Sequence, residues 1–109
     1  MFKNLILSFF SIFKFKPTPP ISSYLTAWVV SKFEAYTDKN INNYAVYASA
    51  TQREKGAEAL KFASYAIDQM HTITDVDYFV DMKMDKLDQV ALPDFSAGAM
   101  ENWGLVTYR

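Results

Sequence analysis

The sequence predicts a mixed α+β chain, and two features of its patterning indicate this. Short runs rich in β-branched, aromatic and other apolar residues, as expected of strands, lie at residues 44–48, 87–92 and 105–108. Between the first two runs, residues 52–71 repeat apolar side chains at the spacing of an amphipathic helix. The chain has 109 residues, which is enough for one small domain.

Composition excludes several kinds of site. The formal net charge is −1, with both signs mixed along the chain, which is unlike the basic footprint of a nucleic-acid-binding protein. There is no cysteine, so disulfides and thiolate metal ligands are excluded. The lone histidine, His71, excludes a multi-histidine zinc site within this sequence. Half of the residues are hydrophobic, which is enough material for an apolar core.

The first 16 residues are apolar and basic, and their apolar stretch at residues 5–13 resembles the core of a signal peptide. A transmembrane helix needs about 20 apolar residues, so this stretch is too short for one. Lysines and a proline follow it, where a signal peptide would have a small-residue cleavage site. We therefore interpret residues 1–16 as an atypical hydrophobic N-terminus.

Residues 17–42 make up a second part of the chain. It opens with a stiff, extended, proline-rich stretch at residues 17–20. Residues 23–30 are aromatic and β-branched, with apolar residues on both alternating faces, which predicts a buried strand. A turn signal at residues 38–40 lies within the polar stretch that follows, and we place a domain boundary at the end of this part.

The predicted helix at residues 52–71 has a start signal and an apolar stripe. Thr51 and Glu54 have the spacing of a capping box, in which two side chains satisfy free amide donors. We interpret the stripe as a core face rather than a ligand site. It consists of Leu60, Phe62, Ala63, Ala66, Ile67 and Met70. At the end of the helix, His71 is expected to be an exposed residue that the helix dipole favours.

A spread of aspartates follows the helix. A calcium loop would need a glycine and a closing glutamate at fixed positions, and the glycine is missing here. Lys83 and Lys86 lie among the acidic residues, so we predict a solvated face. The aspartates are Asp75, Asp77, Asp81, Asp85 and Asp88.

Residues 98–104 lie between the last two predicted strands and carry one carboxylate, Glu101, among small residues. Gly98 and Ala99 would let a partner backbone approach closely, and a fixed carboxylate could hold a cation, which is typical of a peptide-binding edge. The alternative is a tight connection between two core strands with Glu101 in solvent. Spacing alone leaves both interpretations open.

Residues 98–102 spell the motif G-A-M-E-N, and residues 87–109 around it resemble the M1 family of zinc aminopeptidases. The resemblance runs from about Thr18 to Arg109. It implies an exopeptidase that removes residues from peptide N-termini, with Glu101 binding the substrate α-amino group. It further implies that the Gly98 and Ala99 backbone lies along the substrate. The candidate substrate-binding residues are Ala97, Gly98, Ala99, Met100, Glu101 and Asn102.

The resemblance also implies a fold class and a cofactor. Residues 17–42 would be the end of an N-terminal β-domain, and residues 43–109 the start of a thermolysin-like catalytic domain. The family's zinc is held by H-E-x-x-H on a helix that follows the motif strand, together with a further glutamate. This sequence contains no such motif. We therefore expect zinc in the full-length enzyme, and no metal ligand or zinc ion in this chain alone.

The predicted function is that of a partial zinc metallo-aminopeptidase, inactive by itself, whose partners are peptide N-termini. Two alternatives remain: a truncated, non-catalytic relative that only binds peptide N-termini, and a partial gene product without independent function. Family analogy favours the plasma membrane or the outside of the cell, with membrane attachment in the full-length protein; a cytoplasmic protein is the alternative.

Overall fold

The structure is a computed structural model that describes residues 12–109. Residues 1–11, with most of the predicted hydrophobic N-terminus, lie outside the described residues. The strands are β1 Glu34–Asp38, β2 Ile41–Ala48, β3 Leu87–Ala91, β4 Ala99–Met100 and β5 Leu105–Tyr108. The helices are α1 Gly56–Thr74 and two short 3₁₀ helices, η1 Ser23–Leu25 and η2 Arg53–Lys55. The mixed α+β class is therefore confirmed.

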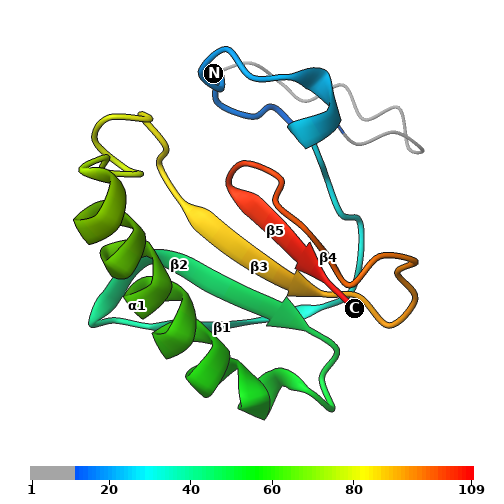
Figure 1. Cartoon of the computed structure of the whole chain (residues 1–109). Helices are drawn as coiled ribbons and strands as arrows, with labels where there is room; N and C mark the ends of the chain where they lie inside the picture. The colour runs from blue at the N-terminus through cyan, green and yellow to red at the C-terminus, as the bar shows by residue number, and fades with distance from the viewer. Residues whose placement is uncertain (1–11) are drawn as a thin grey trace, which may run out of the picture.

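The strands form one mixed sheet in the order β1-β2-β3-β5-β4 (Figure 1). The hairpin partners β1 and β2 are antiparallel, whereas β2, β3 and β5 run parallel to one another. Helix α1 makes the crossover between β2 and β3, as parallel neighbours require. The short strand β4 pairs antiparallel with β5 and is the edge of the sheet.

Helix α1 packs on one face of the sheet, against β2 and β1 (Figure 1). Two residues of α1, Leu60 and Ala63, are buried between the helix and the sheet. Phe62 of the same helix is 72% exposed, and Met70 is also exposed. The predicted apolar stripe is therefore narrower than expected, because α1 lies over only part of the sheet. At the start of α1, a Cβ added to Gly56 would lie 2.6 Å from the Tyr36 Cβ, so glycine allows the helix to approach β1 closely.

The predicted capping box is wrong, although the helix itself is confirmed. Lys55 precedes α1 in helical conformation, and no side chain bonds to the free amides there. The short helix η2 intervenes, so Thr51 lies too far upstream to cap α1, and its hydroxyl instead lies 3.1 Å from the Ser49 hydroxyl. The helix ends at Thr74, where Asp75 has a φ of 56° and donates its N–H to the His71 carbonyl.

The buried strand predicted at residues 23–30 is also wrong. This segment contains only η1, and Trp28 and Val30 are 74% and 94% exposed. An apolar sequence becomes a buried strand only beside neighbouring strands, and none of the strands in residues 12–109 pairs with it. One exposed ion pair, Lys16 Nζ to Asp85 Oδ2 at 2.7 Å, links the N-terminal segment to the loop before β3.

The hairpin of β1 and β2 turns where the sequence predicts, because Asp38 Oδ1 accepts the Asn40 N–H at 2.8 Å. The proposed boundary between residues 42 and 43 lies inside β2, and β1 belongs to the same sheet as β2. The division into two domains stays a prediction.

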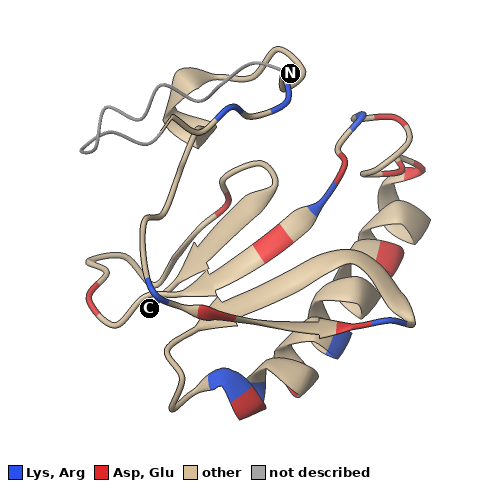
Figure 2. Ribbon diagram, turned by 180° about the vertical axis from the view of Figure 1, so that it is seen from behind, with Lys and Arg blue, Asp and Glu red and all other residues tan. Residues whose placement is uncertain are grey.

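Acidic and basic residues are interspersed along the ribbon (Figure 2). Three ion pairs join residues within the described range, and each lysine or arginine in them is about half exposed or more. No helix in residues 12–109 combines the length and the apolar character that crossing a bilayer requires.

Candidate functional site

The edge strand β4 contains the centre of the predicted motif. Ala99 lies opposite Tyr108 and Met100 opposite Thr107, and the Arg109 N–H donates to the Gly98 carbonyl at 3.0 Å. In an antiparallel pair, hydrogen-bonded and non-hydrogen-bonded positions alternate. Gly98 and Met100 therefore turn their backbone groups towards β5. The Ala99 N–H and carbonyl face the other way, towards the edge where the sheet ends.

This edge is accessible. The loop before it, residues 97–98, and Ala99 itself are exposed. A Cβ added to Gly98 would have no atom within 4 Å, so the space beside the loop is open. A second chain could therefore approach the outward backbone groups of β4, as the interpretation of a peptide-binding edge requires.

Glu101 follows β4 directly and its side chain is exposed. Among residues 12–109, its carboxylate has no hydrogen-bond or ion-pair partner. The carboxylate is therefore available to a cation that arrives with a ligand. The next residue, Asn102, is buried.

A tight turn leads from the motif into β5. The Leu105 N–H donates to the Asn102 carbonyl at 3.1 Å, which closes a four-residue turn. Gly104 occupies the third position with a φ of 75°, the conformation that favours glycine there in a type II turn. Trp103 is half-buried. The turn sets the direction in which the chain passes from Glu101 into β5.

Three residues of the segment before and within β3 contact this turn. Tyr78 Oη accepts the Gly104 N–H at 2.9 Å. The Gly104 carbonyl accepts from Lys86 Nζ at 2.8 Å and from the Asp88 N–H at 3.1 Å. Lys86 Nζ also donates to Asp88 Oδ2 at 2.5 Å. We call Tyr78, Lys86 and Asp88 the Gly104 clamp.

The prediction that the aspartates form a solvated face is wrong for Asp88, which is only 8% exposed. Its position inside β3, directly after the buried Leu87, is the sequence signal that reveals its burial. Asp77 has a local structural role, because it accepts the N–H groups of Phe79 and Val80 at 2.8 and 2.9 Å. Those two bonds hold the pKa of Asp77 below its usual value. Asp75 and Asp85 are exposed, as predicted.

The described residues do not fit a zinc site. In residues 12–109, no three histidine, cysteine, aspartate or glutamate side chains lie close enough together to hold a metal ion. His71 is exposed in the last turn of α1.

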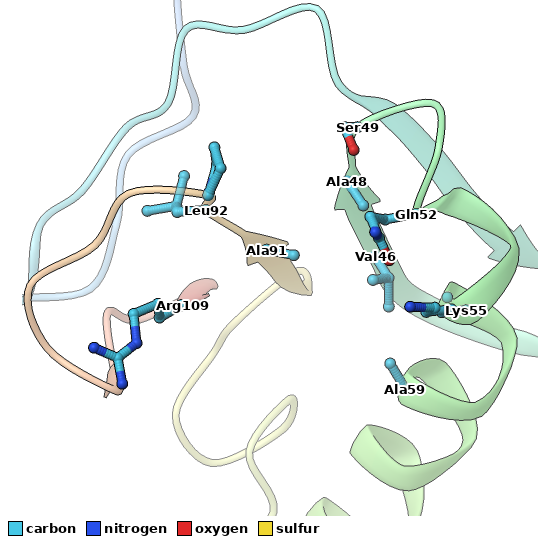
Figure 3. A pocket seen from close by; sticks show the side chains of 11 residues that line it. Val46, Ala48, Ser49, Gln52, Lys55, Ala59, Ala91, Leu92 and Arg109 are labelled. Carbon is cyan, nitrogen blue, oxygen red and sulfur yellow. The ribbon is translucent and has the colours of Figure 1, made fainter.

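A separate hollow of about 450 Å³ lies between the ends of β2 and β3 and the start of α1 (Figure 3). Its walls are largely apolar, with Val46, Ala59 and Ala91 facing the gap and Lys55 reaching into it (Figure 3). None of the residues from 97 to 102 lines it. The hollow therefore does not include the β4 edge, although it is lined by Arg109, whose N–H donates to the Gly98 carbonyl.

Comparison with known proteins establishes the family. Residues 58–109 match the Peptidase family M1 domain. Aminopeptidase N of Canis lupus familiaris is 39% identical over 103 residues, which are 91% of this chain and 10% of that protein. The chain belongs to peptidase family M1.

Further relatives agree with this assignment. Aminopeptidase N of Plutella xylostella is 38% identical, over 92% of this chain and 11% of that protein. Glutamyl aminopeptidase of Bitis rhinoceros is 37% identical, over 87% of this chain and 10% of that protein. The chain thus spans about a tenth of the length of these relatives. The M1 match includes all six candidate substrate-binding residues, whose individual roles stay predictions.

Proposed function

We propose that the β4 edge binds the N-termini of peptides and is the substrate-anchoring part of an M1 zinc aminopeptidase. In this proposal Glu101 pairs with the α-ammonium group of the substrate. The observation that supports it most is the position of the exposed Glu101 carboxylate, directly after an edge strand whose Ala99 backbone groups face outward.

The geometry of this edge supports the binding of a peptide. An extended peptide can add to a sheet edge through main-chain hydrogen bonds, here with the N–H and carbonyl of Ala99. Its ammonium group would then meet Glu101, and a charge-assisted hydrogen bond is strong when it is partly desolvated. The small residues Ala97, Gly98 and Ala99 leave room for the first side chain of the peptide. Met100 and Asn102 hold the strand and the turn on either side of Glu101.

Membership of family M1 implies zinc in the full-length enzymes. A bound zinc ion polarises the scissile carbonyl and acidifies a water molecule. Since residues 12–109 supply no zinc site, we propose hydrolysis only for a longer protein that contains them. A relative from Manduca sexta is named membrane alanyl aminopeptidase, which supports a location at the plasma membrane or outside the cell for that longer protein.

The test compares a peptide that has a free amine with its N-acetylated counterpart. The isotope-labelled chain is titrated with Ala-Ala-Ala-amide and with the acetylated form, and both Kd values are measured by NMR. We expect the free-amine peptide to bind at least about tenfold more tightly, which corresponds to one partly exposed charge pair. Glu101→Gln should remove this preference because it removes the charge.

The matched control is Glu58→Gln, which changes an exposed glutamate on α1 and should keep the preference. Equal affinity of the wild-type chain for the two peptides would contradict the proposed function. A preference that survives Glu101→Gln would show that another group binds the amine.

A further inference from the structure

Both backbone groups of Gly104 are held from outside the turn that contains it. Its N–H donates to the Tyr78 hydroxyl, and its carbonyl accepts from the Lys86 ammonium group and from the Asp88 N–H. These partners are 16 to 26 positions away in the sequence. The Gly104 clamp therefore fixes the turn to the start of β3 by long-range contacts.

The turn also packs closely against the segment before β3. A Cβ added to Gly104 would lie 3.1 Å from Met84 Cε and 3.5 Å from the Lys86 carbonyl oxygen. Gly104 itself is buried. The close approach and the hydrogen bonds act at one residue, so the position of the turn is determined on two sides.

Glu101 lies between two fixed points of the chain. On its N-terminal side, Met100 pairs with Thr107 in the sheet. On its C-terminal side, the clamp holds Gly104, three positions further on. Because its carboxylate has no partner of its own in residues 12–109, its place is set by the backbone on either side.

The ion pair between Lys86 and Asp88 stabilises the turn. The Asp88 side chain is 12% exposed and that of Lys86 is 52% exposed, so the carboxylate is buried and the ammonium group reaches it from the surface. Removal of the ammonium group would leave a buried carboxylate without its partner, which is destabilising. The same ammonium group also bonds the Gly104 carbonyl, so loss of Lys86 acts on the turn directly.

We propose that Tyr78, Lys86 and Asp88 are positioning residues for Glu101. They hold Gly104 so that the Glu101 carboxylate stays at the end of β4, where it meets the ammonium group of a peptide bound along the edge. This inference rests on the proposed function, because it takes Glu101 as the group that binds the amine. In this proposal the clamp acts through Gly104 and not through contact with the peptide.

The first test is Tyr78→Phe, which removes the hydroxyl and keeps the ring. We expect hydrogen exchange at the Gly104 N–H to rise by about tenfold, while exchange at the Leu60 N–H in the core of α1 stays unchanged. The preference for Ala-Ala-Ala-amide over its acetylated form should fall by about threefold or more. The control Tyr65→Phe, at an exposed tyrosine on α1, should change neither quantity.

The second test uses Lys86. Lys86→Met should lower the free-amine preference, and Lys86→Arg should restore most of it, because arginine keeps the charge and the donors. Lys61→Met, at an exposed lysine on α1, is the matched control. A variant that only destabilised the whole fold would raise hydrogen exchange at Leu60 and weaken the binding of both peptides by the same factor. The ratio of the two Kd values therefore separates a positioning role from an effect on stability.

The outcomes distinguish the positioning role of the clamp from the proposed function on which it rests. If the wild-type chain shows no free-amine preference, the proposed function fails and the inference fails with it. If the wild-type preference is present but unchanged in Tyr78→Phe and Lys86→Met, only the positioning role is overturned. Unchanged exchange at Gly104 in Tyr78→Phe would overturn the clamp itself.

Discussion

The three glycines of the chain differ in what an added methyl group would meet. At Gly56 it would meet the Tyr36 Cβ at 2.6 Å, an atom close to the backbone that cannot easily move. At Gly104 it would meet Met84 Cε at 3.1 Å, in a conformation that already favours glycine. At Gly98 it would meet nothing within 4 Å. Packing thus explains the first glycine, and the turn explains the last. Gly98 has no structural requirement of this kind.

This difference predicts opposite effects for two matched variants. Gly56→Ala should lower the free energy of unfolding by about 1–3 kcal/mol, because the overpacked contact with Tyr36 outweighs the better helix propensity of alanine. Gly98→Ala should leave that free energy unchanged or raise it by a few tenths of a kcal/mol. Urea denaturation of both variants measures the two effects.

The same pair tests the edge. Gly98→Ala places a methyl group in the open space that the proposed function gives to the first side chain of the peptide, so its Kd for Ala-Ala-Ala-amide should rise by about tenfold. Gly56 packs on β1, at the opposite edge of the sheet from β4. The Gly56→Ala variant should therefore bind the peptide normally under conditions in which it is folded. Normal peptide binding by Gly98→Ala would show that the peptide does not lie against this residue.

Single residues also show what the sequence could reveal. The exposed Glu101 among small neighbours was recognisable, because both the motif and its flanking strands are contiguous in the chain. The Gly104 clamp was not, because Tyr78 and Lys86 meet Gly104 only after the chain has folded back on itself. Asp88 was misassigned to a solvated face, since a list of nearby acidic residues does not show which of them lies inside a strand.

At the scale of elements, local sequence patterns predicted most helices and strands well. They could not predict which strands pair with one another across long stretches of the chain. Helix α1 was recognisable because its apolar spacing is a property of consecutive residues, although a 3₁₀ turn moved its start to Gly56. The strands β3 and β5 were likewise placed by their apolar runs. The segment at residues 23–30 has an equally strand-like composition. It forms no strand because burial and pairing require partners that composition cannot supply.

The pairing of β4 predicts how proline should act at its two positions. Met100 faces β5 with its N–H, so Met100→Pro should remove a ladder bond and lower the free energy of unfolding by about 1–3 kcal/mol. The Ala99 N–H faces the open edge, where proline is tolerated. Ala99→Pro should therefore change the urea midpoint little and still weaken peptide binding by about tenfold, because it removes the outward donor.

The two proline variants act as controls for each other. Denaturation and peptide titration are measured on both. If Ala99→Pro is as destabilising as Met100→Pro, the outward orientation inferred for the Ala99 backbone is wrong. If Ala99→Pro keeps the wild-type Kd, its N–H is not a ligand of the peptide.

At the scale of the whole molecule, the sheet is covered only in part. Helix α1 lies over β1 and β2 (Figure 1), while on the β3 and β5 side Ala91 and Tyr108 remain exposed, the latter by 38%. Phe62 of α1 is exposed next to them, around a second, smaller apolar hollow of about 290 Å³. Parallel strands are normally covered on both faces. The sequence predicted the α+β class, but it could not show which part of the sheet α1 would leave open.

The last prediction concerns the β4 edge and the missing zinc site together. In the proposed function, the described residues supply a peptide-binding edge and an amine-binding carboxylate, and they do not form a zinc site. We therefore expect the chain alone to hold no stoichiometric zinc after dialysis and to hydrolyse no aminoacyl substrate. Placed in Aminopeptidase N of Canis lupus familiaris in exchange for the matching stretch, residues 12–109 should support hydrolysis.

In that chimaera, Glu101→Ala should lower kcat/KM for an aminoacyl substrate by a factor that corresponds to about 2–5 kcal/mol, because a partly desolvated charge pair with the ammonium group is lost. Glu101→Gln should also be impaired, and the discrimination against the N-acetylated substrate should shrink in both variants. Zinc content should stay at the parent level, because Glu101 is not expected to be a ligand. His71→Gln is the control, since this exposed residue lies in the last turn of α1, outside the β4 edge, and should leave kcat/KM unchanged. Full rate and full selectivity in both Glu101 variants would make Glu101 a structural residue and remove the basis for an amine site at the β4 edge.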